Sequence, residues 1–251
     1  MKILSWSLDS TLDNQNLSLL FERIDNLVKH VLDHEYDVLA FQDVNSMGYD
    51  RLFKGLGEKY KRKLFDQSRF RSDSEMVFVL KKYNISTFEY IPFTVGTQNR
   101  GFQCIVLDFS TSDSSVTFEK PIRNVDRIVI LVAKLETGDS VFNIKKSQAA
   151  CIDKYIASNR YENLVLCLDN STPDYMPDPL KDSYWIDVWC EVGNQDNRYT
   201  VDYMQNLMVT APIRNRCDRI MLKDSFCEYD YSIIVPEDRI SRHCGVVVDL
   251  F

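Results

Sequence analysis

Four side chains that could take part in acid–base or metal chemistry stand in short motifs spread along the chain. Three are carboxylates, Asp43 in FQDV, Asp169 in LCLDNS and Asp218 in RCDRI, and the fourth is the imidazole of His243 in SRHCG. Carboxylates bind hard cations, and histidine exchanges protons near neutral pH. Three of these residues also have a structural interpretation, and for His243 a structural histidine with satisfied hydrogen bonds is the commoner case. The sequence around Asp169 is typical of a turn after a strand, and Asp218 could hold a loop through a salt bridge.

The sequence lacks the familiar catalytic motifs. It contains no glycine-rich phosphate loop, no HExxH, no GxSxG and no pair of cysteines at metal-binding spacing. Its seven cysteines are scattered singly, several of them inside apolar runs, which is typical of reduced thiols that pack as small hydrophobic side chains. This use of cysteine predicts a reducing, intracellular location, in either the cytoplasm or the nucleus.

Length and composition predict one domain over residues 1–251. Hydrophobic residues make up 45% of the chain, enough for a large core, and no linker rich in Pro, Gly or Ser divides it. The net charge of -7 provides no general positive field for nucleic acid or an anionic membrane, so any DNA contact must be local. The N-terminus resembles no signal peptide, and no run of about eighteen apolar residues occurs, so we expect a soluble protein with no membrane partner.

The hydrophobic pattern alternates between the periods of strands and helices. Helical spacing predicts helices over 17–32, 49–56 and 141–157. Compact apolar runs predict strands over 3–8, 37–44, 60–65, 76–80, 85–91, 102–109, 127–135, 163–168, 218–222, 229–235 and 245–251. Two strand-rich halves with helices between them favour two sheets packed face to face, whereas simple βαβ alternation would give a doubly wound sheet. Periodicity alone leaves both open.

The order of six motifs resembles the endonuclease/exonuclease/phosphatase superfamily, and most closely its tyrosyl-DNA phosphodiesterase 2 branch. The motifs are SWSLD at 5–9, FQDV at 41–44, VAKLE at 132–136, LCLDNS at 166–171, RCDRI at 216–220 and SRHCGVVVDL at 241–250. Three further stretches are similar to that branch in particular: VLKKYNISTFEYIPF followed by Arg100, IDVWCEVG, and RYTVD. The resemblance spans nearly the whole chain. It implies an α/β fold, a four-layer sandwich of two packed mixed β-sheets flanked by helices, with a magnesium-dependent phosphodiesterase site at one end.

Carried over position by position, the resemblance implies that most of the family's site has been replaced. The replaced positions are Ser7 for asparagine, Asp43 for the metal-binding glutamate, Lys134 for histidine, Ser171 for asparagine and Arg242 for the aspartate expected to support His243. Asp169 and His243 keep the family's residues as vestiges of the catalytic group, and Asp218 survives beside them. Asp43 is one methylene shorter than glutamate, which makes it a doubtful ligand for magnesium at bond lengths of about 2.0–2.1 Å.

Two of the replacements bring positive charge to the expected site, which keeps three aspartates. These are Lys134 and Arg242. Because a cation and like charges compete for the same carboxylates, we expect the two basic side chains to pair with the aspartates in place of magnesium. We also expect Lys134 and Arg242, together with Arg219, to be the residues that would bind a phosphate.

Two functions are consistent with these residues. The first, which we favour, is a pseudoenzyme that needs no cofactor and acts as an interaction or scaffold protein for a protein partner, with binding of a phosphate or a DNA end left open. The second is an active Mg²⁺-dependent phosphodiesterase or nuclease with a rearranged site, using Asp169 and His243 with Asp43 as its sole acidic ligand. Loss of one transition-state donor typically costs about a hundredfold to a thousandfold in rate, so the loss of several favours the first.

Overall fold

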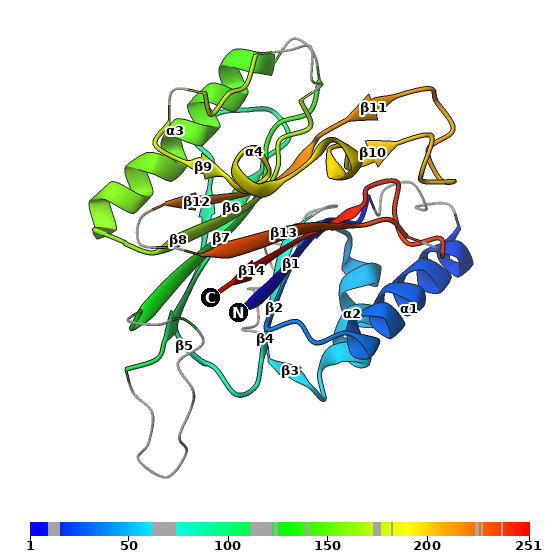
Figure 1. The fold of residues 1–251 in the computed structure, drawn as a ribbon, viewed down its shortest axis with the longest axis horizontal. Helices are drawn as coiled ribbons and strands as arrows, with labels where there is room; N and C mark the ends of the chain where they lie inside the picture. The colour runs from blue at the N-terminus through cyan, green and yellow to red at the C-terminus, as the bar shows by residue number, and fades with distance from the viewer. Residues whose placement is uncertain are drawn as a thin grey trace.

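Two mixed β-sheets packed face to face form the frame of the protein (Figure 1). A computed structural model describes residues 1–9, 16–61, 74–110, 122, 125–138, 141–172, 177–181, 183–223, 226, 228–236 and 238–251. The first sheet contains, in spatial order, β13 (Tyr229–Ile234), β14 (Gly245–Leu250), β1 (Lys2–Ser7), β2 (Val38–Val44), β4 (Ser74–Leu80) and β3 (Tyr60–Lys61). The second contains β5 (Asn84–Pro92), β6 (Gly101–Asp108), β7 (Arg127–Lys134), β8 (Leu164–Asp169), β12 (Asp218–Lys223) and β9 (Ile186–Asp187). One pair in each sheet is parallel, β1 with β2 and β7 with β8.

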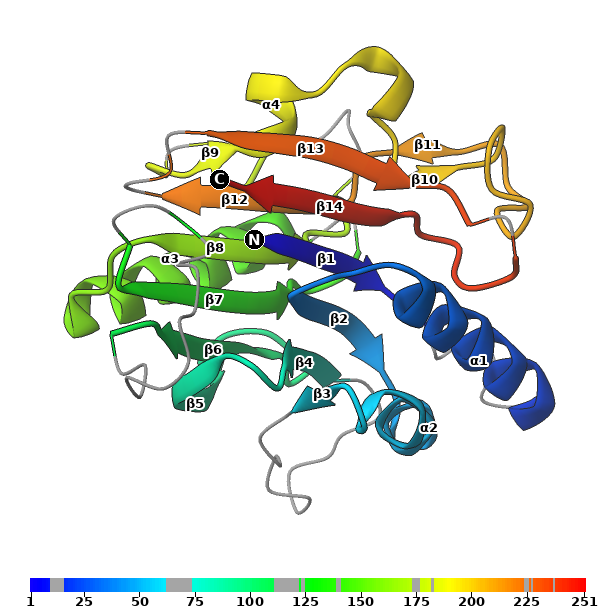
Figure 2. The same ribbon diagram turned by 60° about the horizontal axis from the view of Figure 1, so that its bottom comes forward.

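Helices cover the outer face of each sheet and complete the four layers (Figures 1 and 2). Against the first sheet lie α1 (Leu17–Asp33) and α2 (Ser46–Leu56), and against the second lies α3 (Phe142–Asn159). The short elements α4 (Val188–Val192), η4 (Gln195–Asn197), β10 (Val201–Asp202) and β11 (Arg214–Asn215) follow β9 along the chain. Among the described residues, no helix is both long and apolar enough to cross a membrane. The arrangement confirms the expected four-layer sandwich and excludes the doubly wound sheet.

Alternation of side chains along the strands divides most of the buried apolar residues that the structure describes among three large cores, one between the sheets and one under the helices on each side. In β1, Ile3 packs between the two sheets, whereas Leu4 and Trp6 belong to the core under α1 and α2. On the other side of the sandwich, Leu166 of β8 packs with Ile152 of α3. A strand that is covered on both faces has a nearly continuous run of apolar residues. Such runs are easy to recognise in the sequence, which explains why these strands were predicted.

Most predicted elements agree with the structure to within a few residues at each end. The helix predicted over 49–56 begins earlier, at Ser46, because the Asn45 side chain accepts a hydrogen bond from the backbone N of Gly48 and caps the helix. Of the strand predicted over 60–65, β3 is the described part, and 62–65 lie outside the described residues. The elements from β9 to β11 were not predicted, because two to five residues are too few to show a hydrophobic period.

Gly245 begins β14 where the strand passes against the indole ring of Trp6. A Cβ at this position would lie 2.7 Å from Cε3 of Trp6, which is fully buried. We therefore expect Gly245→Ala to lower the free energy of unfolding by about 1–3 kcal/mol through overpacking, as measured by urea denaturation. Gly48→Ala is the comparison variant. A Cβ there would lie 3.3 Å from Oδ1 of Asn45, which is less crowded than 2.7 Å from a buried ring, so we expect a smaller change in the free energy of unfolding. A Gly245→Ala protein as stable as the wild type would contradict this packing.

Candidate active site

Strand ends from both sheets meet at one end of the sandwich, where the arrowheads of β1, β2 and β7 point (Figure 2). In the second sheet, Asp169 of β8 pairs with Lys134 of β7 on one side and with Asp218 of β12 on the other. From the first sheet, Ser7 ends β1 and Asp43 lies one residue before the end of β2. Strand pairing therefore assembles a cluster from residues that are far apart in the sequence.

Asp43 reaches the second sheet because β2 is irregular near its end. The pairing of β2 with β4 shifts register between Phe41 and Val44, and Asp43 has a left-handed backbone with φ of 59°. A bulge redirects a side chain that strict alternation would point elsewhere. Left-handed residues other than glycine are uncommon and gather at functional sites. Here the bulge directs Asp43 toward Lys134.

Lys134 lies between two carboxylates at the centre of the cluster. Its Nζ is 2.9 Å from Oδ2 of Asp43 and 3.0 Å from Oδ2 of Asp169. The side chain of Lys134 is 6% exposed and that of Asp169 is 0% exposed, so solvent screens these charges little. Burial alone would lower the pKa of Lys134, but the charges of Asp169 and then Asp43 raise it above its ordinary value. Lys134 is therefore a constant cation in a triad that links the two sheets.

The Asp169 carboxylate is saturated by donors from the protein. Its Oδ1 accepts from the backbone N and the Oγ of Ser171, at 2.9 and 2.8 Å. Its Oδ2 accepts from the Oγ of Ser7 at 2.8 Å, in addition to the contact with Lys134. Burial would raise the pKa of Asp169, but the charges of Lys134 and His243 and the hydrogen bonds from Lys134 and Ser7 hold it well below its ordinary range. A carboxylate with so low a pKa is a weak general base.

Arg100 is a second cation at the site, and it was not predicted as a site residue. Its Nη1 lies 3.8 Å from Oδ1 of Asp43, and its Nε donates to the side-chain oxygen of Gln98 at 2.9 Å. The buried carboxylate of Glu136 accepts from the backbone N of Thr97 at 2.8 Å and so holds this loop in place. Glu136, in the VAKLE motif, thereby positions Arg100 beside Asp43.

Glu75 is another ionisable residue near the cluster that was not predicted as a site residue. It lies in β4 and is 4% exposed. Burial raises its pKa to about 7, although the charge of Arg100 opposes this shift. The available signal was a charged residue at the start of an otherwise apolar strand, because a buried carboxylate needs a charged or hydrogen-bonding neighbour.

His243 has an acidic partner, contrary to the expectation that the replacement at Arg242 had removed it. Its Nδ1 is 2.7 Å from Oδ2 of Asp218. Burial alone would lower the pKa of His243, but the charge and hydrogen bond of Asp218, and then the charge of Asp169, raise it to about 9. The backbone N of Asp218 donates to Oγ1 of Thr200 at 3.0 Å, which holds the strand end in position. The expectation was wrong because a motif shows a residue's sequence neighbours but not its neighbours across strands.

Arg242 and Arg219 are paired outside the carboxylate cluster. Arg242 donates from Nε to Asp9, and its side chain is 45% exposed. Arg219 is ion-paired through Nη1 with Asp178 and Asp187. Of the two cations expected to replace the metal, Lys134 contacts the site aspartates, and the expectation for Arg242 is wrong. A phosphate at Arg242 or Arg219 would have to compete with these aspartates.

Comparisons with known proteins agree on the architecture. No protein-family model and no curated protein matches the sequence. Among solved structures, truncated TDP2 from Caenorhabditis elegans is 18% identical with a TM-score of 0.80, over 100% of this chain and 96% of that chain. TDP2 from D. rerio, complexed with a single strand DNA product, is 19% identical with a TM-score of 0.79, over 100% and 98%. The endonuclease/exonuclease/phosphatase from Bacteroides vulgatus is 15% identical with a TM-score of 0.72, over 100% and 98%.

This chain has the endonuclease/exonuclease/phosphatase fold. Identities this low show the fold alone, so what the site does must be argued from its own residues.

The residues present in this endonuclease/exonuclease/phosphatase-fold protein do not fit the magnesium ion that the resemblance implies. An ion bridging Asp43 and Asp169 would need oxygens at about 2.0–2.1 Å, in the space that the ammonium of Lys134 takes up. Asp169, Asp218 and His243 offer ligand atoms within 4.8 Å of one another. However, magnesium prefers oxygen ligands to imidazole, and a metal ion there would have to displace the proton that Asp218 favours on His243.

Removal of the ammonium should destabilise the protein strongly. We expect Lys134→Met to lower the free energy of unfolding by about 3–5 kcal/mol, because two buried carboxylates lose their shared cation. Lys82→Met is the matched control. Lys82 also bonds an aspartate, Asp37, at 3.0 Å, but its side chain is 50% exposed, so we expect a change below about 1 kcal/mol. Urea denaturation of both variants measures the difference, and equal losses would contradict the central role of the buried triad.

The His243–Asp218 pair should make stability depend on pH. Because the pKa of His243 rises from 6.5 to about 9 on folding, its contribution is complete below pH 6.5 and is lost as the pH rises through 9. We expect the stability difference between wild type and His243→Gln to shrink over this window, as measured by urea denaturation at several pH values. Asp218→Asn should flatten the same pH dependence. A difference that grows with pH would show that His243 folds as the neutral imidazole.

Proposed function

We propose that this protein is a catalytically impaired relative of the tyrosyl-DNA phosphodiesterases that acts as an interaction or scaffold protein. The observation that carries the proposal is the Nζ of Lys134, which bridges Asp43 and Asp169 at 2.9 and 3.0 Å. Hydrolysis of a phosphodiester needs a hard cation on the phosphoryl oxygens, a general base for water and donors for the developing charge. In this protein a fixed ammonium neutralises the carboxylates that would bind the cation.

The other catalytic tasks are also poorly served. Asp169 has a lowered pKa and four protein donors, so it is a weak base for water. The hydroxyls of Ser7 and Ser171 both donate to Asp169, which leaves neither hydrogen positioned for a substrate. Each missing donor costs about a hundredfold to a thousandfold in rate, so the combined loss leaves little activity even if the effects are not additive.

The second candidate function is an active phosphodiesterase or nuclease that cleaves DNA phosphodiester or 5′-tyrosyl-DNA bonds with a rearranged site. The observation that favours it is the His243–Asp218 pair, whose atoms are 2.7 Å apart. An imidazolium oriented by a carboxylate can donate a hydrogen bond to a developing oxyanion. Without a cation and a base beside it, this pair supplies one part of the reaction, so the scaffold function stays our choice.

Partner and location belong to the same proposal. A protein partner suits a chain with a net charge of -7, and a phosphate or a DNA end is the weaker candidate because Lys134 and Arg242 are both ion-paired. None of the six described cysteines forms a disulfide bond, which supports a reducing compartment, either the cytoplasm or the nucleus.

An assay with 5′-tyrosyl single-stranded DNA tests the proposal. This substrate is chosen because the D. rerio neighbour was crystallised with a single strand DNA product. We expect no release of tyrosine above the rate of Asp169→Ala, with either Mg²⁺ or Mn²⁺, because Lys134 takes up the space of the metal. Turnover that Asp169→Ala abolishes would overturn the choice.

A quadruple variant on the same backbone is the matched control. It carries Ser7→Asn, Asp43→Glu, Lys134→His and Ser171→Asn. Activity in this variant, together with none in the wild type, would assign the loss to these side chains. Magnesium binding by the wild type, stoichiometric and removed by Asp43→Ala, would contradict the proposal independently of turnover.

A further inference from the structure

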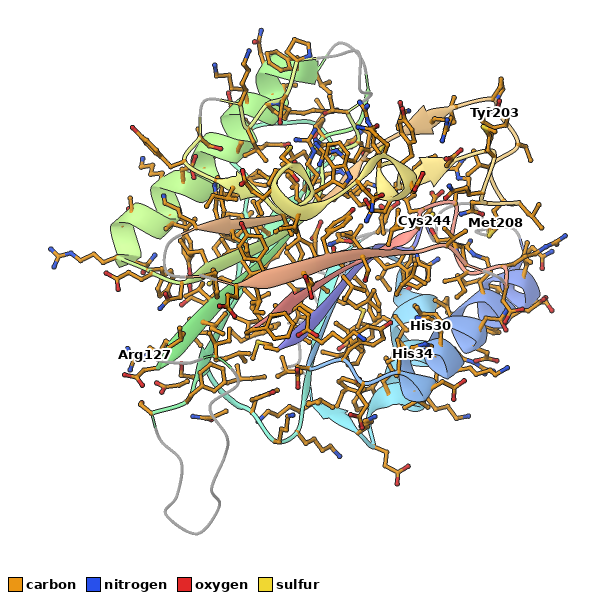
Figure 3. The ribbon with its side chains drawn as sticks, viewed as in Figure 1. His30, His34, Arg127, Tyr203, Met208 and Cys244 are labelled. Carbon is orange, nitrogen blue, oxygen red and sulfur yellow. The ribbon has the colours of Figure 1, made fainter. Side chains whose placement is uncertain are left out.

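Two histidines lie one helical turn apart at the C-terminal end of α1. His30 belongs to the last turn of the helix, and His34 is its C-cap residue. Their rings lie close together (Figure 3) and stack, with centroids 4.3 Å apart and planes inclined by 25°. Side chains four residues apart share a helix face, and two histidines at this spacing can bind one metal ion between them.

Hydrogen bonds engage one nitrogen of each ring and leave the other available. Nδ1 of His34 lies 2.8 Å from the carbonyl oxygen of His30. A carbonyl oxygen only accepts, so this nitrogen carries the proton and, in the neutral ring, Nε2 of His34 keeps its lone pair. In His30 the engaged nitrogen is Nε2, 3.1 Å from the hydroxyl of Tyr36, and its Nδ1 has no hydrogen-bond partner among the described residues. Histidine ligands of metal ions are commonly oriented in this way, through the ring nitrogen that does not bind the metal.

The surroundings of the two rings favour a cation. Both histidines line a groove of about 290 Å³ between α1 and the segment that follows β13. Asp33 and Asp238 line the same groove and bring two negative charges, against the one positive charge of Lys29. The carbonyl end of α1 adds partial negative charge. Burial, and then the charge of His34, lowers the pKa of His30 to about 4, so this imidazole has no proton to lose to a metal ion at neutral pH.

We propose that His30 and His34 bind a divalent transition-metal ion of the class that prefers imidazole nitrogen, such as Zn²⁺. The ligand atoms are Nδ1 of His30 and Nε2 of His34. A tetrahedral ion at about 2.0–2.1 Å from each needs these nitrogens about 3.4 Å apart. Since the ring centroids are 4.3 Å apart, a small turn of the rings is required, which the exposed ring of His34 can make. The inference goes beyond the scaffold function and does not depend on the state of the active site.

Isothermal titration calorimetry with zinc chloride, on protein without a polyhistidine tag, tests the site. We expect the wild type to bind Zn²⁺ through this pair. His30→Gln and His34→Gln should each lower the affinity at least about tenfold, because only one of the two imidazole ligands remains. If circular dichroism shows that His30→Gln is unfolded, His34→Gln decides the test, since His34 is exposed.

Three control variants separate this site from other zinc ligands of the chain. His243→Gln removes the third histidine, which belongs to the carboxylate cluster of the active site, and Cys190→Ser removes an exposed thiol. Both proteins should bind Zn²⁺ at the α1 pair as tightly as the wild type. The double variant His34→Gln, Glu35→His keeps the number of histidines but changes their spacing, so we expect it to bind at least about tenfold more weakly.

Nitrogen NMR of the imidazole rings gives a readout that a purely structural role of the histidines would not produce. We expect Zn²⁺ to shift the resonances of Nδ1 of His30 and Nε2 of His34, because these atoms would bind the ion. The resonances of His243 should stay unchanged.

Four results would overturn the inference. They are a wild type that does not bind Zn²⁺, binding that neither histidine variant of α1 weakens, binding that His243→Gln or Cys190→Ser removes, and a variant with changed histidine spacing that binds as tightly as the wild type. None of these results concerns turnover, so they leave the proposed function untouched.

Discussion

The buried triad of Asp43, Lys134 and Asp169 is the interaction on which the site end of the sandwich depends. The carboxylates come from facing sheets, and two such charges without a cation would repel each other and lose their solvation. One ammonium satisfies both and joins the layers at the end of the core between the sheets. The same contact takes up the space and the charge that a hard cation would need. The link between the sheets and the poor fit for a metal ion therefore have one physical origin.

Hydrogen bonds between the motifs hold the strand ends together beside the buried triad. The Oγ of Ser241 donates to the carbonyl of Ser7 at 2.6 Å, and the indole of Trp6 donates to the carbonyl of His243 at 2.8 Å. The backbone N of Cys244 donates to the carbonyl of Thr200 at 2.7 Å. These bonds join the SWSLD, RYTVD and SRHCGVVVDL stretches, and in each of them the acceptor is a backbone carbonyl. None of these bonds uses a side chain of the triad, so they hold the strand ends together independently of it.

The sequence was informative where a physical signal is local. Helical periodicity predicted α1. Continuous apolar runs predicted strands such as β2 and β8, because a strand that is buried on both faces consists mostly of apolar residues. Lys134 was predicted to neutralise aspartates because the resemblance placed it at a site with three carboxylates, where a buried charge needs a partner. The short strands β10 and β11 show no such pattern in the sequence. Their form depends on contacts such as Asn206 to Ser241 that periodicity cannot reveal.

By itself, the sequence predicted the order of the long elements and, through the resemblance of its motifs, the layered fold class. Only the tertiary structure decided which charges meet. In the folded chain His243 contacts Asp218, Arg242 pairs with Asp9 instead of a site aspartate, and Glu75 lies close enough to the triad to interact with its charges. The reason is physical. Side-chain periodicity is a property of residues that are neighbours in the sequence. An ion pair instead depends on charged atoms that lie within about 4 Å of each other. Strand register and the bulge in β2 set those distances between remote parts of the chain.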